Sequence, residues 1–577
     1  MKLYQALLLL TAVVSAMASL LLQSPSKSLA TDLHFALEKS IPNSSEGVSP
    51  KLHFSDLTHA AKTGWSASDP KRGAAITVWG SGFEKTRGDS YITVNGIKLT
   101  MDADYAEWNA DSYDVFFLKR ITFWLRGECE NGVGSITVTV GGKTSEELPF
   151  SIISGRICFV DADAQSPGDG SFEAPWASPN VAVKSLEPGD VLYFRETASP
   201  YNKKFFTGKQ NFYLTRGNSK DGLADAPIAL VSFPGEVATI DTRVSEGESP
   251  LAGNFVLARN YWTISKFRLR ASKTCLFLGS NDGERGHGIR AVGNDCVGCQ
   301  EFGSGTAPIA TFGSNMSVLG NSSHGGRTNN KLDHAIYISG NPSVVKGVEL
   351  GWNYAYDNDY AEGPMLVVNH QGNRIPPGRS CKQHDIHHNL IDCTLFAGRG
   401  IGIYSMSWDQ QQGETEPDRA FVFNNIVLGA GWKNSPSAAA IYCLNGKASI
   451  FHNTLVNCVE NAITVGGEDV LSVEIENNIL HVADGSGYIY LVPGSKSLVI
   501  KNNLYYGLGA GPSVDDQRIE AAPSLNRHLI PTVDGPEVNA SSANTGVRTD
   551  FWGKPRTTGS AADIGACEYD ADTRLAN

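Results

Sequence analysis

One short pattern recurs along this chain and narrows the folds open to it: an apolar strand that ends at an asparagine. The pattern reads SVLGN, VELGWN, DIHHN, FVFNN, SIFHN, EIENN and VIKNN, and it ends at Asn321, Asn353, Asn389, Asn425, Asn453, Asn478 and Asn503. The steps between these asparagines are 32, 36, 36, 28, 25 and 25 residues. A step that settles at one length predicts a solenoid, in which each repeat forms one coil and longer steps hold inserted loops. Asparagines stacked at one inward turn can hydrogen-bond each other and the backbone along the axis.

A second series of apolar strands alternates with the first. It reads HGIRAV, HAIYIS, GPMLVV, RGIGIY, AAIYCL, NAITVG and GYIYLV, and these pieces begin at His287, His334, Gly363, Arg399, Ala439, Asn461 and Gly487. The third and fifth residues of each piece are mostly apolar and should point into a core, so the fourth residues, Tyr337 among them, should face outward. The two interleaved columns predict an all-β fold, a parallel β-helix.

Both ends of the repeat region resemble a known family. The stretch from Ile157, ICFVDADAQSPGDGSFEAPWASPNVAVKSLEPGDVLYFRE, resembles the entry of right-handed parallel β-helix proteins of the pectate-lyase-like superfamily, where a short helix caps the first coil. The stretch DFWGKPRTTGSAADIGACEYD resembles the closing segment of secreted bacterial β-helix proteins. The resemblance implies a right-handed β-helix over residues 154–577. It does not imply one activity, because this architecture hosts lyases, hydrolases, epimerases and adhesins.

Residues 51–153 have a different character. Alternating pieces such as AAITVWGSGF, SYITVNGIKL and GSITVTVGGK predict antiparallel strands of a small β-sandwich. The pattern resembles the IPT/TIG immunoglobulin-like domains, and this resemblance implies a spacer or binding module. Residues 31–50, which are polar and contain Ser and Pro, predict a flexible leader.

The first residues predict export. MKLYQALLLLTAVVSAMASLLL combines a lysine, an apolar run and the small-x-small pattern Ala16-Met17-Ala18, which predicts a signal peptide within residues 1–30 and a secreted, cell-surface or periplasmic protein. An uncleaved N-terminal membrane anchor is the alternative, since the run approaches the ~20 residues that a span needs. No later stretch is apolar and long enough to cross a bilayer, and we expect a monomer.

Charge and cysteine content narrow the partners further. A formal net charge of −12 argues against a nucleic-acid partner, and it disfavours a polyanionic substrate unless a local basic cleft or a bound cation overrides it. Ten cysteines permit disulfides in an exported protein, although the sequence does not give their pairing. The near neighbours Cys381/Cys393 and Cys443/Cys458 predict structural cysteines, either bridged or buried in the stack.

Departures from the coil pattern concentrate between about residues 324 and 415. Six of the 13 histidines lie between 324 and 388. The loops there interrupt the regular step, and insertions in a solenoid cluster on its binding face. The strand column places Asp333-His334, the acidic loop 357–362 and Arg399 on successive coils, ~4.8 Å apart, so that they can flank one sugar unit.

These residues predict a polysaccharide lyase acting on a uronate-containing polymer by β-elimination. That reaction needs a cation for the uronate carboxylate, a base for the C5 proton and an acid for the leaving oxygen. The candidate base and acid are His334, His370, Arg399 and Tyr404, and Arg399 or Lys331 could neutralise the carboxylate. Candidate oxygen ligands for Ca²⁺ are Asp333, Asp357, Asp359 and Glu362. Candidates for sugar contact are Tyr337, Asn369, Arg374 and Trp408.

Each candidate also has a purely structural interpretation. His334 could cap its strand by bonding a backbone carbonyl, Arg399 could pair with Asp333 or Glu362, and residues 357–362 could form an ordinary turn. Two other functions stay open: a glycoside hydrolase on the same fold, which needs two carboxylates placed across the bond, and a surface adhesin or polysaccharide-binding protein without catalysis.

Overall fold

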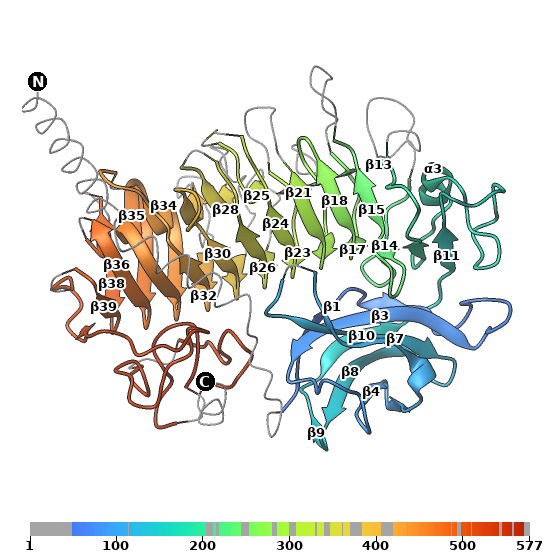
Figure 1. Ribbon diagram of the computed structural model, residues 1–577, viewed down its shortest axis with the longest axis horizontal. Helices are drawn as coiled ribbons and strands as arrows, with labels where there is room; N and C mark the ends of the chain where they lie inside the picture. Colours follow the sequence, from blue (N-terminus) through green and yellow to red (C-terminus); the bar gives the residue numbers. More distant parts are fainter. Residues whose placement is uncertain are drawn as a thin grey trace, which may run out of the picture.

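The chain folds into two β-modules that pack side by side (Figure 1). The computed structural model describes residues 49–569, apart from these short gaps: 114, 203–211, 215–218, 244–252, 280–285, 299–306, 329, 331, 340–346, 361, 370–383, 405–418, 436, 486, 493–497, 509–510, 542–544 and 557–558. The predicted signal peptide and nearly all of the predicted leader therefore lie outside the described residues. Among the described residues, no helix has the length and apolar character needed to cross a bilayer.

The N-terminal module is a sandwich of two small, mainly antiparallel sheets. One sheet has the order β1 (Lys51–Ser55), β3 (Arg72–Ser81), β7 (Lys119–Arg126) and β6 (Tyr105–Asp111). The other has the order β2 (His59–Ala60), β10 (Leu148–Ile152), β8 (Gly132–Val140), β4 (Tyr91–Val94) and β5 (Ile97–Leu99), with β9 (Lys143–Thr144) paired to β8. The 3-10 helix η1 (Asp102–Asp104) precedes β6. Alternating residues of both sheets bury a shared core, as the period-2 pattern predicts.

The second module is the predicted parallel β-helix, in which most coils contribute one strand to each of three parallel sheets. The first sheet begins with β11 (Ile157–Val160) and contains β12 (Val191–Phe194), β14 (Ile228–Ser232), β17 (Trp262–Ser265), β20 (Arg290–Val292), β23 (Met316–Leu319), β26 (Val348–Gly351), β29 (His384–His387), β32 (Arg419–Phe423), the ends of β34 (Ala439–Phe451) and β35 (Thr454–Glu476), and β38 (Leu498–Lys501). The helix α3 (Pro179–Lys184) lies between β11 and β12 at the entry of the stack.

The other two sheets complete each coil. The second sheet contains β15 (Thr239–Asp241), β18 (Arg268–Ala271), β21 (Asp295–Gly298), β24 (Ser322–His324), β27 (Tyr354–Tyr356), β30 (Leu390–Asp392), β33 (Ile426–Leu428), the start of β35, β36 (Ile479–Gly485), β39 (Leu504–Tyr506) and β40 (Ile519–Glu520). The third sheet contains β13 (Phe212–Leu214), β16 (Phe255–Leu257), β19 (Leu276–Gly279), β22 (Ile309–Phe312), β25 (Ile336–Ser339), β28 (Pro364–Asn369), β31 (Arg399–Tyr404), the start of β34, the middle of β35, and β37 (Ile489–Leu491).

The predicted asparagine column forms a continuous hydrogen-bonded ladder at the turn between the first and second sheets. Each carboxamide oxygen accepts both the backbone N–H and the side-chain N–H of the asparagine one coil earlier, as Asn389 Oδ1 does from Asn353 (both 3.0 Å). The ladder begins one coil earlier than the sequence pattern indicates, at Asn294, whose Oδ1 accepts the N–H of Phe267. It ends at Asp515, whose carboxylate accepts from the backbone and side chain of Asn503 and from Tyr505. Buried turn amides are thereby satisfied on each coil that the ladder crosses.

Two details of the predicted strand columns are wrong. The piece HGIRAV forms β20, which pairs with β17 and β23 in the first sheet rather than joining the second column. In GPMLVV the pattern predicts that the fourth residue, Leu366, faces outward. In the structure Leu366 is in register with the inward Ile336, and it is Val367 that is in register with the outward Tyr337. Both errors have one cause: the two columns share the same apolar alternation, which does not distinguish neighbouring sheets or a one-residue shift.

The residue just before each ladder asparagine adopts the left-handed conformation and points away from the core. These residues are Gly293, Gly320, Trp352, His388, Asn424, His452, Asn477 and Asn502, with φ between 53° and 63°. At two coils under the sandwich the position is glycine: a Cβ at Gly293 would lie 2.5 Å from the Trp79 ring, and one at Gly320 would lie 2.5 Å from the Phe54 ring. These close approaches explain why these two coils lack a side chain there, whereas Trp352 on the next coil packs its ring against Phe54 and His53 of the sandwich.

Further along the same column, the C-terminal segment (residues 525–568) docks through hydrogen bonds. His388 Nε2 donates to the carbonyl of Asp550 (2.9 Å), Asn424 Nδ2 donates to the carbonyl of Thr549 (2.6 Å), and His452 Nδ1 donates to the carbonyl of Asp563 (3.2 Å). The sandwich and this segment share one apolar cluster with the outer faces of the first and second sheets. Figure 1 shows both lying along the same side of the β-helix.

The described cysteines are buried and unbridged. They are Cys129, Cys158, Cys275, Cys296, Cys393, Cys443, Cys458 and Cys567. Of the two alternatives for Cys443 and Cys458, the structure therefore has burial in the stack, and Cys393 is buried likewise. Cys381 lies outside the described residues.

Candidate functional site

Five of the residues selected from the sequence lie in the third sheet or directly before one of its strands: His334, Tyr337, Asn369, Arg399 and Tyr404. Its register aligns Ile336 with Leu366 and Ile401, so that His334, Pro364 and Arg399 occupy one column on three successive coils. Adjacent coils are about 4.8 Å apart, which places the backbones of His334 and Arg399 about 10 Å apart. The predicted placement of His334 and Arg399 in one column is confirmed.

His334 is held in one tautomer. Its Nδ1 lies 2.9 Å from the carbonyl oxygen of Pro364, and because that oxygen can only accept, Nδ1 carries the hydrogen. The ring stacks on Tyr337 with centroids 5.2 Å apart and planes 12° apart. Burial lowers the pKa of His334 to about 4, and the charge of Arg399 acts in the same direction, so the ring is neutral at pH 7. The predicted carbonyl cap is therefore present, and it leaves Nε2 as the unprotonated nitrogen.

Tyr337 and Asn369 extend the site along the strands. The side-chain amide of Asn369 donates to the Tyr337 hydroxyl over 3.4 Å. Asn369 is in register with Tyr404 on the next coil. Both Tyr337 and Asn369 are partly exposed, so the structure brings these two candidates for sugar contact together on the outer face.

Arg399 supplies the positive charge of this face. Its Nε and Nη2 donate to the carbonyl and hydroxyl of Ser437 (2.7 and 2.8 Å), and its Nη1 donates to the carbonyl of Glu362 (2.9 Å). All three acceptors are neutral, so no carboxylate meets the guanidinium through these bonds, and two of its five N–H groups are not used in them. The guanidinium also lies 4.7 Å from the centre of the Trp432 ring. No carboxylate of the described residues pairs with Arg399, so the structure shows neither predicted ion pair, to Asp333 or to Glu362.

The strands around Arg399 carry no other charge. Across the described strands of the third sheet, namely FYL, FVL, LFLG, IATF, IYIS, PMLVVN, RGIGIY, AAIYCL, NAITVG and IYL, Arg399 is the one charged residue. A cation on strands that carry no other charge is an electrostatic target for an anionic group.

Tyr404 folds back over its own strand toward Arg399. A Cβ at Gly402 would lie 2.5 Å from Cε2 of Tyr404 and 3.2 Å from Cγ of Pro364, so the ring occupies the space that glycine leaves open. Tyr404 and His334 therefore both border Pro364. The Tyr404 and Tyr442 rings lie 5.4 Å apart. Burial raises the pKa of Tyr404 to about 12, although Arg399 opposes the shift, so the phenol is protonated at pH 7.

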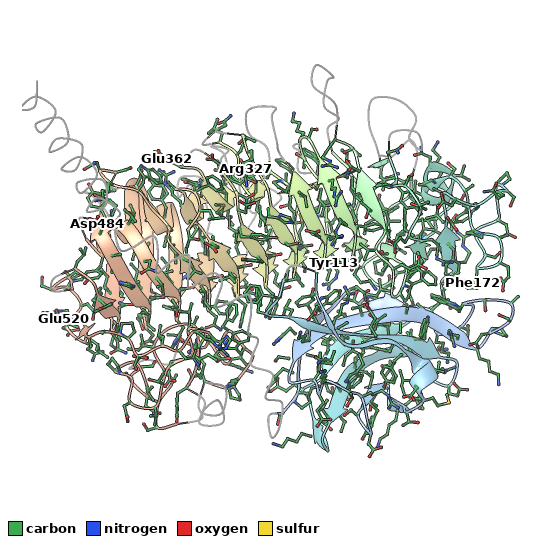
Figure 2. The ribbon with its side chains drawn as sticks, in the orientation of Figure 1. Tyr113, Phe172, Arg327, Glu362, Asp484 and Glu520 are labelled. Carbon is green, nitrogen blue, oxygen red and sulfur yellow. The ribbon has the colours of Figure 1, made fainter. Side chains whose placement is uncertain are left out.

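The predicted calcium ligands do not form a cation site. Asp333 has no exposed surface, and Asp357 Oδ1 already accepts a hydrogen bond from Arg327 Nη2 (2.6 Å). Asp359 pairs with Arg327 through the backbone, and Glu362 is exposed at the corner beside the third sheet. Figure 2 shows Arg327 and Glu362 on the side of the β-helix away from the sandwich. The described part of the chain contains no group of three His, Cys, Asp or Glu that could hold a metal, so we derive no step through Ca²⁺.

Four predicted site residues, Lys331, His370, Arg374 and Trp408, lie outside the described residues. Two contributors, Trp432 and Ser437, were not selected from the sequence. Tyr442 is the fourth residue of its strand piece, which the pattern predicts to face outward, and it occupies the outward position in register with Gly402. Trp432 and Ser437 lie in the turn before β34 and had no periodic signal.

Comparisons with known proteins gave matches among solved structures alone. No protein-family model and no curated protein matches the sequence. Among solved structures, the chain is similar to the pectate lyase Pel9A (14% identity, TM-score 0.34, covering 72% of this chain and 98% of that one) and to a rhamnogalacturonan lyase (12%, 0.36, 69% and 99%). It is also similar to a lacto-N-biosidase of family GH136 from Eubacterium ramulus (13%, 0.35, 63% and 67%). These likenesses carry no argument about chemistry.

Proposed function

We propose that this protein is an exported polysaccharide lyase that cleaves a uronate-containing polymer by β-elimination on the outer face of the third sheet. The observation that carries the proposal is Arg399. It is the one charged residue of the described third-sheet strands, its bonds go to neutral acceptors, and it lies against Trp432 and Tyr442. A guanidinium on aromatic rings suits a sugar carboxylate, because the charge meets the anion while the rings meet the sugar face.

Each catalytic task has a candidate group. Arg399 binds the uronate carboxylate and stabilises the negative charge that develops there as the C5 proton leaves. His334 Nε2 takes that proton, and the electron pair of the C5–H bond forms the C4–C5 double bond. The C4–O bond breaks, and the leaving oxygen receives a proton from the Tyr404 hydroxyl. Atoms and charge balance without an added reactant.

The protonation states support these roles. The lowered pKa of His334, about 4, keeps the base unprotonated above pH 5, and the raised pKa of Tyr404, about 12, keeps the acid protonated. A hydrolase would require a pair of carboxylates across the bond instead. The described strands of the third sheet contain none.

The test is a screen of the purified protein on alginate, polygalacturonate, glycosaminoglycans and bacterial exopolysaccharides, with near-ultraviolet absorbance and product mass both recorded. We expect an unsaturated, absorbing product whose mass shows no gain of water. Tyr404→Phe, which removes one hydroxyl, should slow elimination by about 10²–10⁴-fold. Arg419→Gln is the matched control for Arg399→Gln, since Arg419 pairs with Glu474 on the first sheet and should not affect turnover.

The outcomes separate three functions. If no uronate polymer is turned over, the lyase proposal is refuted. A product heavier by one water would favour the hydrolase, and saturable binding without turnover would favour a polysaccharide-binding protein.

A further inference from the structure

A second group of aromatic side chains continues the outer face of the third sheet toward the N-terminal coils. Phe277 of β19 and Phe312 of β22 stack with ring centroids 4.8 Å apart and planes 30° apart. Phe312 also contacts the Tyr337 ring at 6.3 Å, and Tyr337 stacks on His334. The aromatic strip Phe277–Phe312–Tyr337 is therefore continuous with the proposed site.

The register explains how the strip forms. Phe277 and Tyr337 occupy the same outward line, with Ala310 between them, and the small Ala310 side chain leaves room for the rings. Phe312 is two residues further along its strand than Ala310. It is in register with Asn369 and Tyr404 and lies three coils before Tyr404. Phe277, Phe312 and Tyr337 are all partly exposed, so the rings are accessible along the direction in which a polymer would lie.

The strip differs from the Arg399 end of the face in charge. The strands LFLG, IATF and IYIS, which carry the strip, contain no charged residue, and Phe has no hydrogen-bonding group. A uronate placed here would bring its carboxylate against two phenyl rings without a cation from these strands, and it would lose hydration without compensation. A neutral sugar would place its C–H surface on the rings at no such cost.

We propose that Phe277 and Phe312 form a binding subsite for an uncharged sugar, and that the substrate is therefore a heteropolysaccharide in which neutral sugars are interspersed with uronates. The inference rests on the proposed function, because it takes the uronate at Arg399 as the anchor of the polymer. It adds a substrate class: polymers made only of uronates present a carboxylate to every subsite and fit this face less well.

The experiment measures equilibrium binding and elimination separately, for the full-length protein and for Phe312→Ala. The probes are mixed polymers (gellan and hyaluronan, in which neutral sugars separate the glucuronates) and polygalacturonate of matched length. Phe421→Ala is the matched control, because Phe421 is also a partly exposed, outward phenylalanine, but on β32 of the first sheet. We expect the protein to bind at least one mixed polymer more tightly than polygalacturonate. Phe312→Ala should weaken that binding by about two- to tenfold, and Phe421→Ala should leave it unchanged.

The readouts distinguish the two ideas. The neutral subsite is refuted if Phe312→Ala binds the mixed polymers as tightly as the parent protein does. It is also refuted if the parent binds only polygalacturonate or none of the probes. Both conclusions hold whether or not the elimination assay detects an unsaturated product. If binding of a mixed polymer depends on Phe312 but no polymer is cleaved, the subsite stands and the proposed lyase activity fails.

Discussion

Removing one amide from the middle of the asparagine ladder should destabilise the β-helix strongly. Asn389 is fully buried, its Oδ1 accepts two N–H groups of Asn353, and its Nδ2 donates to the carbonyl of Leu350 (2.9 Å) and to Asn425 Oδ1 (2.9 Å). Asn389→Ala removes the acceptor of the Asn353 backbone N–H and the side-chain donor of the Leu350 carbonyl. Each buried group left unpaired costs about 1–3 kcal/mol, so we expect a loss of about 2–6 kcal/mol in the free energy of unfolding.

The assay is urea unfolding followed by tryptophan fluorescence and far-ultraviolet circular dichroism together, because only coincident transitions give a meaningful free energy for a chain of this size. Asn131→Ala is the control: this asparagine is exposed in the bend before β8, and its replacement should change stability by no more than about 0.5 kcal/mol. If Asn389→Ala and Asn131→Ala unfold at the same urea concentration, the ladder is not a source of stability and the reasoning fails.

Further predictions concern the end of the ladder, the site and pH. Asp515→Asn should cost about 1–3 kcal/mol, because an amide brings its own N–H groups toward the donors of Asn503 and Tyr505; urea midpoints check this, and an unchanged midpoint contradicts it. Gly402→Ala should displace the Tyr404 ring and lower elimination while leaving the circular dichroism spectrum unchanged; parent-like turnover would refute the packing argument. Burial lowers the pKa of His53 to about 4 and the pKa of His388 and His452 well below 6.5, so their contribution to stability is present above about pH 6.5 and lost as the pH falls. Below pH 6.5 we expect up to about 1.4 kcal/mol lost per pH unit for each of these histidines, seen as a falling thermal midpoint; a midpoint that is flat between pH 6.5 and 4 would contradict the assignment.

The sequence was sufficient for the fold because the information is local and repeated. Seven of the eight ladder asparagines follow strands whose alternation is plain, and each predicts its own coil. Asn294 was not predicted as a ladder residue, because the piece HGIRAV before it fits both strand columns. Only the pairing across coils assigns β20 to the first sheet. Alternation within one strand shows which residues share a face, but not which sheet the strand joins.

The candidate site was predictable only in part, for a related reason. His334 and Arg399 stand at equivalent positions of their strands, so the repeat alone placed them in one column. The partners of Arg399 come from a turn, where Ser437 and Trp432 follow no period. The surroundings of the predicted calcium ligands could not be read from the sequence, because Asp357 lies close to Arg327 in space, 30 residues away in the chain, and that ion pair has no signature in either segment.

The ladder also has a direction. In the bonds between asparagines, every described rung donates to the next rung toward the C-terminal end and accepts from the rung before it, so successive rungs are chemically interchangeable. Only the two ends differ: a backbone N–H of Phe267 opens the series and the Asp515 carboxylate closes it. Duplicating or deleting one whole coil between them would leave every donor matched to an acceptor. The length of the binding face could therefore change in evolution by whole coils, without any redesign of the start or the stop.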